Sequence, residues 1–136
     1  MSEYFEFLYN SNFGVFEFSE KFKNVYKITT GEDFNELYLN DIKLRTNPVI
    51  LKIVKLIGLK NSQGEFSQFE IRIFPKKFYN YMKLCECDGS ETPYIDINQY
   101  IIDLITYGTS EDFWYIKQEV DTCSGINKYG IKLVKV

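Results

Sequence analysis

The chain has 136 residues, of which 45% are hydrophobic and 26% charged, so its length and composition fit a single soluble domain with a sizeable core. No apolar run approaches the roughly 18 residues that a membrane span needs, and the acidic N-terminus lacks the basic region of a signal peptide. A net charge of -3, with Arg45 and Arg72 as the only arginines, argues against nucleic-acid binding.

The first third of the chain reads as a series of strands. Apolar and polar residues alternate over residues 4–9, turn-forming residues follow at 10–12, and alternation resumes over residues 14–18. This pattern predicts a hairpin over residues 4–18, with one buried face on its first strand. Residues 22–29 predict a third strand, and residues 37–44 predict a tight hairpin around Asn40-Asp41.

The clearest helix is predicted over residues 48–57. Asn47 (or Thr46) suits the N-cap, and Pro48 suits the first helical position, where a missing N–H costs nothing. Gly58 suits the left-handed residue that closes a helix. One apolar stripe is formed by Ile50, Ile53, Val54 and Ile57.

The next segments predict strands again. Phe69, Ile71 and Ile73 alternate with polar residues, which predicts a strand with one buried face that Pro75 ends. Residues 81–87 and 94–97 predict two paired strands around an Asp88-Gly89 turn.

A second helix is predicted over residues 98–107, where it would bury Ile101, Leu104 and Ile105. Residues 111–120 are ambiguous between helix and strand, and residues 130–136 predict a strand that closes the sheet. The prediction is therefore a single α+β domain over residues 1–136, with a mostly antiparallel sheet and about two helices packed on it.

The order of motifs in residues 40–105 resembles a family of small uncharacterised proteins of giant DNA viruses and phages. In that family a basic-Thr-Asp/Asn-Pro helix start is followed by a Leu-Gly helix end, an Ile-Pro strand end and a Tyr-Asp-Gly-x-Glu turn. The corresponding residues here are Arg45-Thr46-Asn47-Pro48, Ile57-Gly58, Phe74-Pro75 and Cys87-Asp88-Gly89-Ser90-Glu91, so Cys87 replaces the usual tyrosine. The resemblance implies a viral origin and an α+β domain, and it implies no activity.

The residue types exclude several kinds of chemistry. The chain has no histidine, which excludes Ser-His and Cys-His nucleophiles and His-ligated metals. It also lacks the glycine-rich phosphate loops. Cys85, Cys87 and Cys123 are predicted to be buried free thiols, although a zinc site completed by a carboxylate is the alternative. We therefore predict no enzyme activity, no cofactor and no metal.

Carboxylates gather around one turn, at Asp88, Glu91 and Asp96. Asp88 and Glu91 could form an acid–base pair or bind a hard cation. The alternative is purely structural, because Asp-Gly is a strong hairpin signal and Glu91 could accept hydrogen bonds from backbone N–H groups.

Aromatic residues make up 18% of the chain, while alanine is absent. Coding drift in an AT-rich genome explains this bias, and a tyrosine-rich partner surface is the alternative. Trp114 is the only tryptophan and lies beside Tyr115, so it is either a core residue or an anchor for a partner. The interaction candidates are Trp114, Tyr115, Asp88 and Glu91.

The function predicted from these features is a virus-encoded accessory protein that acts as a non-enzymatic protein-interaction module in the cytoplasm of the host cell. Its partner would be a host or viral protein, with no role for membranes and with the oligomeric state left open. The first alternative is a virion component, such as a minor capsid or tegument-like protein, whose terminal edge strands pair in an assembly. The second is a carboxylate- and metal-dependent hydrolase.

Overall fold

The computed structural model describes residues 3–107, 114–123 and 126–135, and its helices and antiparallel strands confirm the α+β class. In chain order the elements are β1 (Tyr4–Asn10), α1 (Glu20–Thr30), the 3-10 helix η1 (Glu36–Tyr38), α2 (Ile42–Arg45), α3 (Pro48–Ile57), α4 (Leu59–Ser62), β2 (Phe69–Pro75), the 3-10 helix η2 (Lys76–Tyr81), β3 (Met82–Cys87), β4 (Ser90–Ile95), α5 (Ile97–Tyr107), β5 (Trp114–Cys123) and β6 (Ile126–Lys135). The prediction of about two helices was therefore too low.

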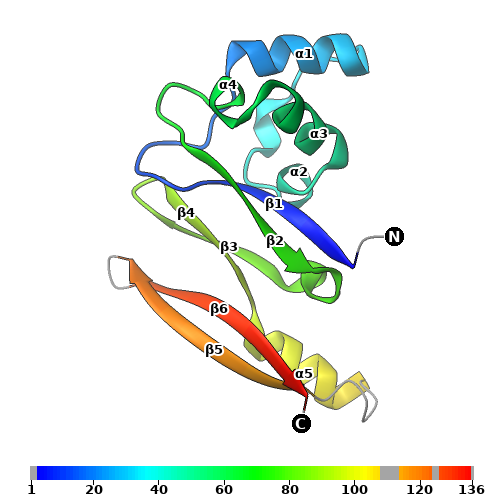
Figure 1. Ribbon diagram of the computed structural model, residues 1–136, viewed down its shortest axis with the longest axis vertical. Helices are drawn as coiled ribbons and strands as arrows, with labels where there is room; N and C mark the ends of the chain where they lie inside the picture. The colour runs from blue at the N-terminus through cyan, green and yellow to red at the C-terminus, as the bar shows by residue number, and fades with distance from the viewer. Residues whose placement is uncertain (1–2, 108–113, 124–125, 136) are drawn as a thin grey trace.

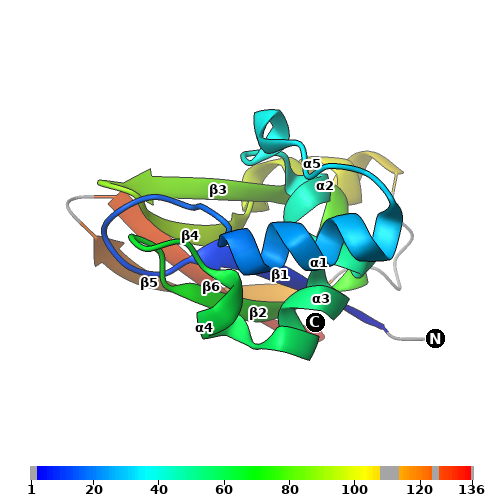
Figure 2. The ribbon, with the colours of Figure 1, turned by 90° about the horizontal axis from the view of Figure 1, so that it is seen from above.

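The helices α1 to α4 gather at one end of the molecule, and the hairpin β5–β6 lies at the other (Figure 1). Seen from above, α1 and α3 cover the strands β1 and β2 (Figure 2). The strands form separate two-stranded antiparallel sheets, which pair β1 with β2, β3 with β4 and β5 with β6. The predicted closure of one sheet by the last strand was wrong, since β6 pairs with β5.

The predicted hairpin over residues 4–18 was wrong, because the partner of β1 is β2, some sixty residues further along the chain. The register places Phe7 opposite Arg72 and Asn10 opposite Phe69. Residues 14–18 do alternate in burial, with Phe16 and Phe18 inside, but they run as an extended segment that makes only a single bridge, from Phe18 to Gln63.

The strand predicted over residues 22–29 is the helix α1. The Ser19 side chain accepts a hydrogen bond from the Phe22 N–H at the N-terminus, and Gly31 closes the helix with φ 77°. Phe22, Val25 and Tyr26 are spaced by three and four positions, so one face of the helix packs into the core. The Val, Ile, Thr and Tyr content of the segment favours strand, but the caps and the apolar spacing decided the outcome.

The tight hairpin predicted over residues 37–44 was also wrong. Asn35 caps η1 and Asp41 caps α2, each by accepting a hydrogen bond from a backbone N–H two residues later. The Asn40-Asp41 pair therefore precedes a helix, where Asp is a favoured capping residue, and does not form a hairpin turn.

The predicted helix over residues 48–57 is confirmed as α3, and its N-terminus is capped as expected. The Asn47 side chain accepts hydrogen bonds from the N–H groups of Val49 and Ile50, at 2.9 and 3.3 Å, and Pro48 occupies the first turn. Gly58 ends the helix as predicted, but at φ 93° and ψ 151°, an extended conformation open mainly to glycine and not the left-handed one predicted, and the short helix α4 follows.

Asn47→Ala should lower the free energy of unfolding by about 1 kcal/mol, because two N–H groups at the start of α3 lose their acceptor. Chemical denaturation of the variant and the wild type measures the difference. Asn24→Ala, at an exposed position in the middle of α1, is the control and should leave stability nearly unchanged. Equal effects of the two changes would contradict the capping role.

The strand predicted over residues 69–73 is confirmed as β2, but its predicted buried face holds only at the start. Phe69 is buried and Ile71 is half-buried, whereas Ile73 is exposed and Phe74 is buried instead. The helix predicted over residues 98–107 is confirmed as α5. Of its predicted apolar stripe only Leu104 is half-buried, because it packs beside the buried Tyr100, while Ile101 and Ile105 are exposed.

The hairpin predicted around Asp88-Gly89 is confirmed as β3 and β4. Cys85 and Cys87 lie on β3 in no disulfide, as predicted, but they are half-buried and not buried. The ambiguous segment that contains Trp114 is the strand β5, which Cys123 ends.

β1 lies between two hydrophobic clusters, because successive side chains of a strand point to opposite faces. Leu8 packs with the helices α1 and α3 and with Phe69, whereas Phe7 and Tyr9 pack with Phe78, Met82 and Tyr100. β1 is therefore buried on both faces along its second half, and not on one face as predicted. Burial and a hydrogen bond to the Glu70 carboxylate raise the pKa of Tyr9.

Candidate interaction surface

The Asp88-Gly89 turn that joins β3 to β4 is held against another loop of the chain. Asp88 and Gly89 have φ values of 50° and 84°, as a two-residue hairpin turn of this hand requires. The Asp88 carbonyl accepts a hydrogen bond from the Gly14 N–H at 3.1 Å, and the Gly89 carbonyl accepts one from Asn10 Nδ2 at 2.8 Å. The Asp88 side chain remains exposed.

Gly14 is the point where three loops meet. Its N–H donates to the Asp88 turn, and the N–H of the next residue, Val15, donates to the Phe66 carbonyl at 3.2 Å. Gly14 has a φ of 132°, and a Cβ at this position would overlap the Phe66 carbonyl oxygen. We call residues 12–15, 64–67 and 88–89 the Gly14 junction, and their backbones are fixed against one another by these contacts.

Two phenylalanines project from the Gly14 junction into solvent. Phe13 is 62% exposed and Phe66 is 65% exposed. Both line a groove of about 540 Å³, whose wall continues over Leu59 of α4 and Phe69 of β2. Two large aromatic side chains at one groove, on loops held in place, form the largest exposed apolar feature of the junction.

The groove is lined by charged residues of both signs, Glu65 and Lys60. Near the groove, the Gly64 N–H donates to the carbonyl of Glu17 in the segment before α1, and Asp88 is exposed beside Gly14. Lys60 lines the groove on the α4 side. We use the name junction surface for Phe13, Phe66, Glu65 and Asp88 together.

Glu91 lies in the interior, in contrast to Asp88. It is 6% exposed, and its two carboxylate oxygens accept hydrogen bonds from Arg45 Nη1 and Nη2 at 2.7 and 2.8 Å. The Asn10 backbone N–H donates to the same carboxylate at 2.8 Å. Glu91 thus accepts a hydrogen bond from a backbone N–H, as the structural interpretation of this residue predicted. Because it is buried, it is not part of the junction surface.

Arg45 is 0% exposed and connects several elements. Its Nε donates to the Leu39 carbonyl at 2.6 Å and its Nη1 to the Leu8 carbonyl at 3.3 Å. The guanidinium carbon lies 3.3 Å from the centre of the Phe16 ring. This single side chain joins α2 to β1, to β4, to the loop after η1 and to the segment before α1.

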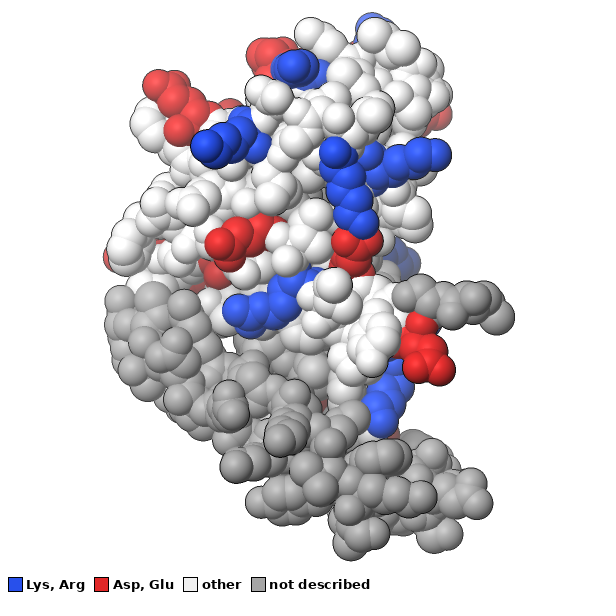
Figure 3. Space-filling model, viewed as in Figure 1, with Lys and Arg blue, Asp and Glu red and all other residues white. Residues whose placement is uncertain are grey.

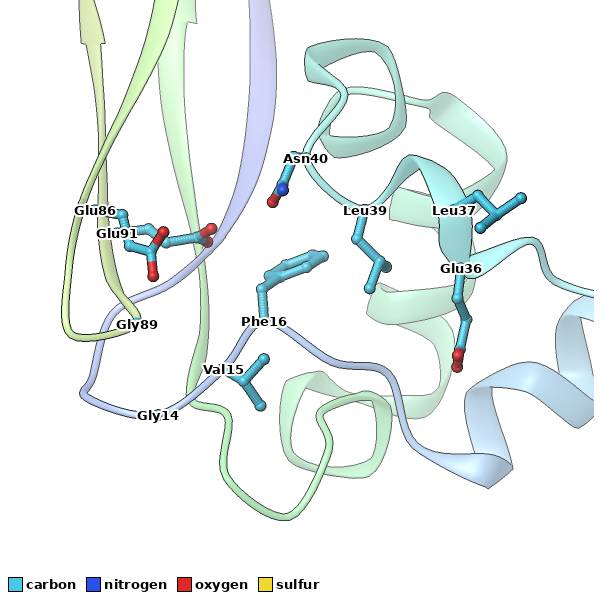
Figure 4. A pocket seen from close by; sticks show the side chains of 10 residues that line it. All are labelled: Gly14, Val15, Phe16, Glu36, Leu37, Leu39, Asn40, Glu86, Gly89 and Glu91. Atoms are coloured by element: carbon cyan, nitrogen blue, oxygen red, sulfur yellow. The ribbon is translucent and has the colours of Figure 1, made fainter.

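A second depression, of about 330 Å³, lies above Phe16 (Figure 4). Glu86 and Glu91 stand on one side of it, and Leu37 and Glu36 stand on the other. Glu91 is held by Arg45, and Glu36 pairs with Lys23. Neither carboxylate is therefore free to act with Glu86 as an acid–base pair. Among the residues that the structure describes, no group of three or more His, Cys, Asp or Glu side chains could hold a metal ion.

Of the four residues predicted from the sequence, only Asp88 and Glu91 have described side chains. Trp114 and Tyr115 begin β5, opposite Lys135 and Val134, and their side chains lie outside the described residues. The sequence prediction missed Phe13 and Phe66. The signal for them was their context, because each follows a polar loop segment and lies within two residues of a glycine.

The comparisons of the whole chain add no family. No protein-family model matches the chain, and searches of curated proteins and of solved structures found no match either. Within the described residues, no helix has the length and apolar composition that crossing a membrane requires.

Proposed function

We propose that this protein is a virus-encoded accessory protein that acts without catalysis, by binding another protein through the junction surface. The observation that carries the proposal is the pair Phe13 and Phe66, which are both more exposed than buried although they line one groove. Exposed aromatic side chains are favoured anchors in protein interfaces, because they bury a large area at a small cost in conformational entropy.

The loops that carry these rings support the proposal further. The hydrogen bonds from Gly14 and Val15 hold the two loops and the Asp88 turn in a fixed arrangement. A surface that is already ordered loses little conformational freedom on binding, so more of the contact energy remains as affinity. Asp88 is exposed, and its backbone contacts Gly14, which lines the groove, so we propose that its carboxylate adds charge selectivity.

The viral origin in this proposal rests on the resemblance of residues 40–105 to small proteins of giant DNA viruses and phages. The proposed site of action is the cytoplasm of the infected cell. Trp114 and Tyr115 remain candidates for a second contact, on the hairpin β5–β6 at the other end of the molecule (Figure 1).

The test is a pull-down from a lysate of infected cells, read by quantitative mass spectrometry. We expect one protein to be enriched by the wild type, reduced by Asp88→Ala and lost with Phe13→Ser/Phe66→Ser. Trp114→Ala in parallel reports on β5. Ile28→Ser/Ile73→Ser is the matched control, because these two side chains are also exposed but lie on α1 and β2.

The control double variant should retain the partner. Loss of the partner in both double variants would mean that nonspecific hydrophobic binding, and not the junction surface, causes the enrichment. A partner that survives Phe13→Ser/Phe66→Ser would contradict the proposed site, and no enriched protein at all would contradict binding to a separate partner.

A structural component of the virus particle is the second candidate. It is favoured by one observation, namely that α3 presents Val49 and Leu56 to solvent, which neighbouring copies in a particle could cover. Quantitative proteomics of purified particles tests it, and absence of the protein from the particles would remove this candidate.

A further inference from the structure

The strand β2 has an edge that no other strand covers. Among the residues that the structure describes, β2 pairs with β1 and with no further strand. Residues 70–73 are all exposed or half-buried, and Ile73 is 62% exposed. In Figure 2, β2 runs along the side of the molecule away from β3. An unpaired strand edge presents backbone N–H and C=O groups that another strand can bind.

Alternate residues of β2 turn their backbone groups toward this edge. The Ser11 N–H donates to the Gln68 carbonyl at 2.8 Å, just before β2 begins. Because the groups that face the partner strand alternate along an antiparallel ladder, the even-numbered residues of β2 face β1 and the odd-numbered residues face outward. The N–H and C=O groups of Ile71 and Ile73 therefore point to the open edge. We call residues 70–73 the β2 edge.

The opposite edge of this two-stranded sheet is occupied by side chains. On β1, the Asn10 N–H donates to the Glu91 carboxylate at 2.8 Å, and the Leu8 carbonyl accepts a hydrogen bond from Arg45 Nη1 at 3.3 Å. Because Glu91 and Arg45 are buried, no further strand can reach β1 there. The edge of this sheet that is available for pairing is therefore the β2 edge.

The β2 edge carries opposite charges two residues apart. Glu70 and Arg72 lie on the same face of the strand, where the Tyr9 hydroxyl donates to Glu70 Oε2 at 2.8 Å and the Arg72 guanidinium carbon lies 5.6 Å from the centre of the Tyr9 ring. Neither side chain forms an ion pair within the described part of the chain. Figure 3 shows acidic and basic side chains intermixed over the face of the molecule on which β2 lies.

The sequence of the β2 edge is complementary to itself in one register. Two antiparallel copies can form a ladder only with outward-facing residues opposite each other, so the pairing must be centred on a residue and not between two. A centre at Ile71 places Glu70 of each copy opposite Arg72 of the other. A centre at Glu70 or at Arg72 places like charges opposite each other, which destabilises a ladder.

We propose that two copies of this chain pair through their β2 edges, antiparallel and centred on Ile71, to form a dimer. Ile71 exchanges two backbone hydrogen bonds with Ile71 of the other copy, and the Ile73 N–H donates to the Phe69 carbonyl of the other copy. The Phe69 N–H is already bonded to the Gln63 side chain, at 3.0 Å, so the ladder ends at this residue. The same edge is used by both copies, so the contact is isologous and the assembly stops at two.

The proposed dimer is independent of the proposed function, because the β2 edge shares no residue with the junction surface. The experiment uses the purified full chain and sedimentation velocity over a concentration series. We expect the average mass to rise with concentration from the 16.1 kDa of one chain toward twice that value and no further. Glu70→Arg and Arg72→Glu each place like charges opposite each other, so each should stay monomeric where the wild type is mostly dimeric.

An equimolar mixture of these two variants tests the register. In a mixed pair both contacts join opposite charges, so the dimer should return although neither variant forms it alone. The double variant Glu70→Arg/Arg72→Glu should dimerise by itself for the same reason. Lys21→Glu is the control, because it makes the same change of charge as Arg72→Glu at an exposed position of α1 and should dimerise like the wild type.

A proline tests the backbone hydrogen bonds directly. Ile73→Pro removes an N–H that faces outward, so the pairing with β1 is kept and the ladder between the two copies is lost. This variant should be monomeric. Ile73→Thr is its matched control, because threonine keeps the N–H and the branched side chain that suits a strand, and it should remain dimeric. Circular dichroism and thermal unfolding of each variant establish that it is folded.

Four outcomes would overturn the inference. They are a wild type that stays monomeric at every concentration, an assembly that grows beyond two copies, a dimer that persists in Glu70→Arg, Arg72→Glu or Ile73→Pro, and a variant mixture that forms no dimer. A monomeric wild type that still captures one protein through Phe13 and Phe66 would overturn the dimer and leave the proposed function standing. A dimer that captures no other protein would support the inference and contradict the proposed function.

Discussion

Replacing Glu91 by alanine should lower the free energy of unfolding by about 3–5 kcal/mol, the cost of removing one partner of a buried ion pair. Arg45 would keep its positive charge at 0% exposure without the two carboxylate oxygens that neutralise it. The buried N–H of Asn10 would also lose its acceptor. Urea denaturation followed by circular dichroism measures the change from the shift of the midpoint.

Two further variants separate charge burial from simple truncation. Glu86→Ala removes the residue directly opposite Glu91 in the hairpin, at an exposed position, and should change stability by no more than about 0.5 kcal/mol. The double variant Arg45→Met/Glu91→Met replaces both charges by apolar side chains and should recover much of the loss. A loss below about 1 kcal/mol in Glu91→Ala would contradict the importance of the pair.

Gly89→Ala should destabilise the protein by about 3 kcal/mol, through two separate effects. An alanine there must adopt a φ of 84°, and its Cβ would overlap the backbone carbonyl of Gly14. Backbone atoms cannot rotate away as a side chain can, so the loops of the Gly14 junction would have to separate. Thermal or chemical denaturation reports the loss of stability.

Gly31→Ala is the matched control for this change. Gly31 also has a positive φ, of 77°, but a Cβ at this position has nothing within 4 Å. Only the conformational cost remains, and we expect about 1 kcal/mol. If Gly89→Ala and Gly31→Ala lower the free energy of unfolding equally, the contact between residue 89 and the Gly14 carbonyl does not contribute to the destabilisation.

Elements whose signals lie close together in the sequence were predicted well. The cap at Asn47, the proline at Pro48 and the stop at Gly58 all lie within twelve residues and define α3 without help from the rest of the chain. The Asp88-Gly89 turn is equally local, because its backbone conformation depends on the two residues themselves.

The pairing of β1 could not be read in the same way. Asn10 and its neighbours have the residue types of a hairpin turn, but the Asn10 side chain bonds to Gly89 and Gln68, far along the chain. The side chains of turn-forming residues can bind backbone groups that are near in the sequence or far from it. The sequence alone therefore does not reveal which backbone groups they bind. The helix α1 was missed for another reason, because strand-forming residue types outweighed its caps at Ser19 and Gly31.

The candidate surface was predicted only in part. Asp88 was identified because a carboxylate in a turn is exposed as a rule. Phe13 and Phe66 differ in the sequence from the other aromatic residues only in their polar, glycine-containing context, and their exposure depends on which loops come together at Gly14. Exposure of a large apolar side chain is a property of the tertiary structure, and the residue pattern carries little information about it.

The position of Glu91 in the chain also affects the order in which the protein can fold during synthesis. Arg45 is 46 positions, and Asn10 is 81 positions, ahead of the carboxylate that both of them bind. At about 5–20 residues per second, the ribosome completes α1 to α4 seconds before it delivers β4. Until then the guanidinium has no buried anion to receive it, so the nascent helices should stay loosely associated and accessible to chaperones. Docking of the β3–β4 hairpin would then be the step that commits the N-terminal half to its final packing.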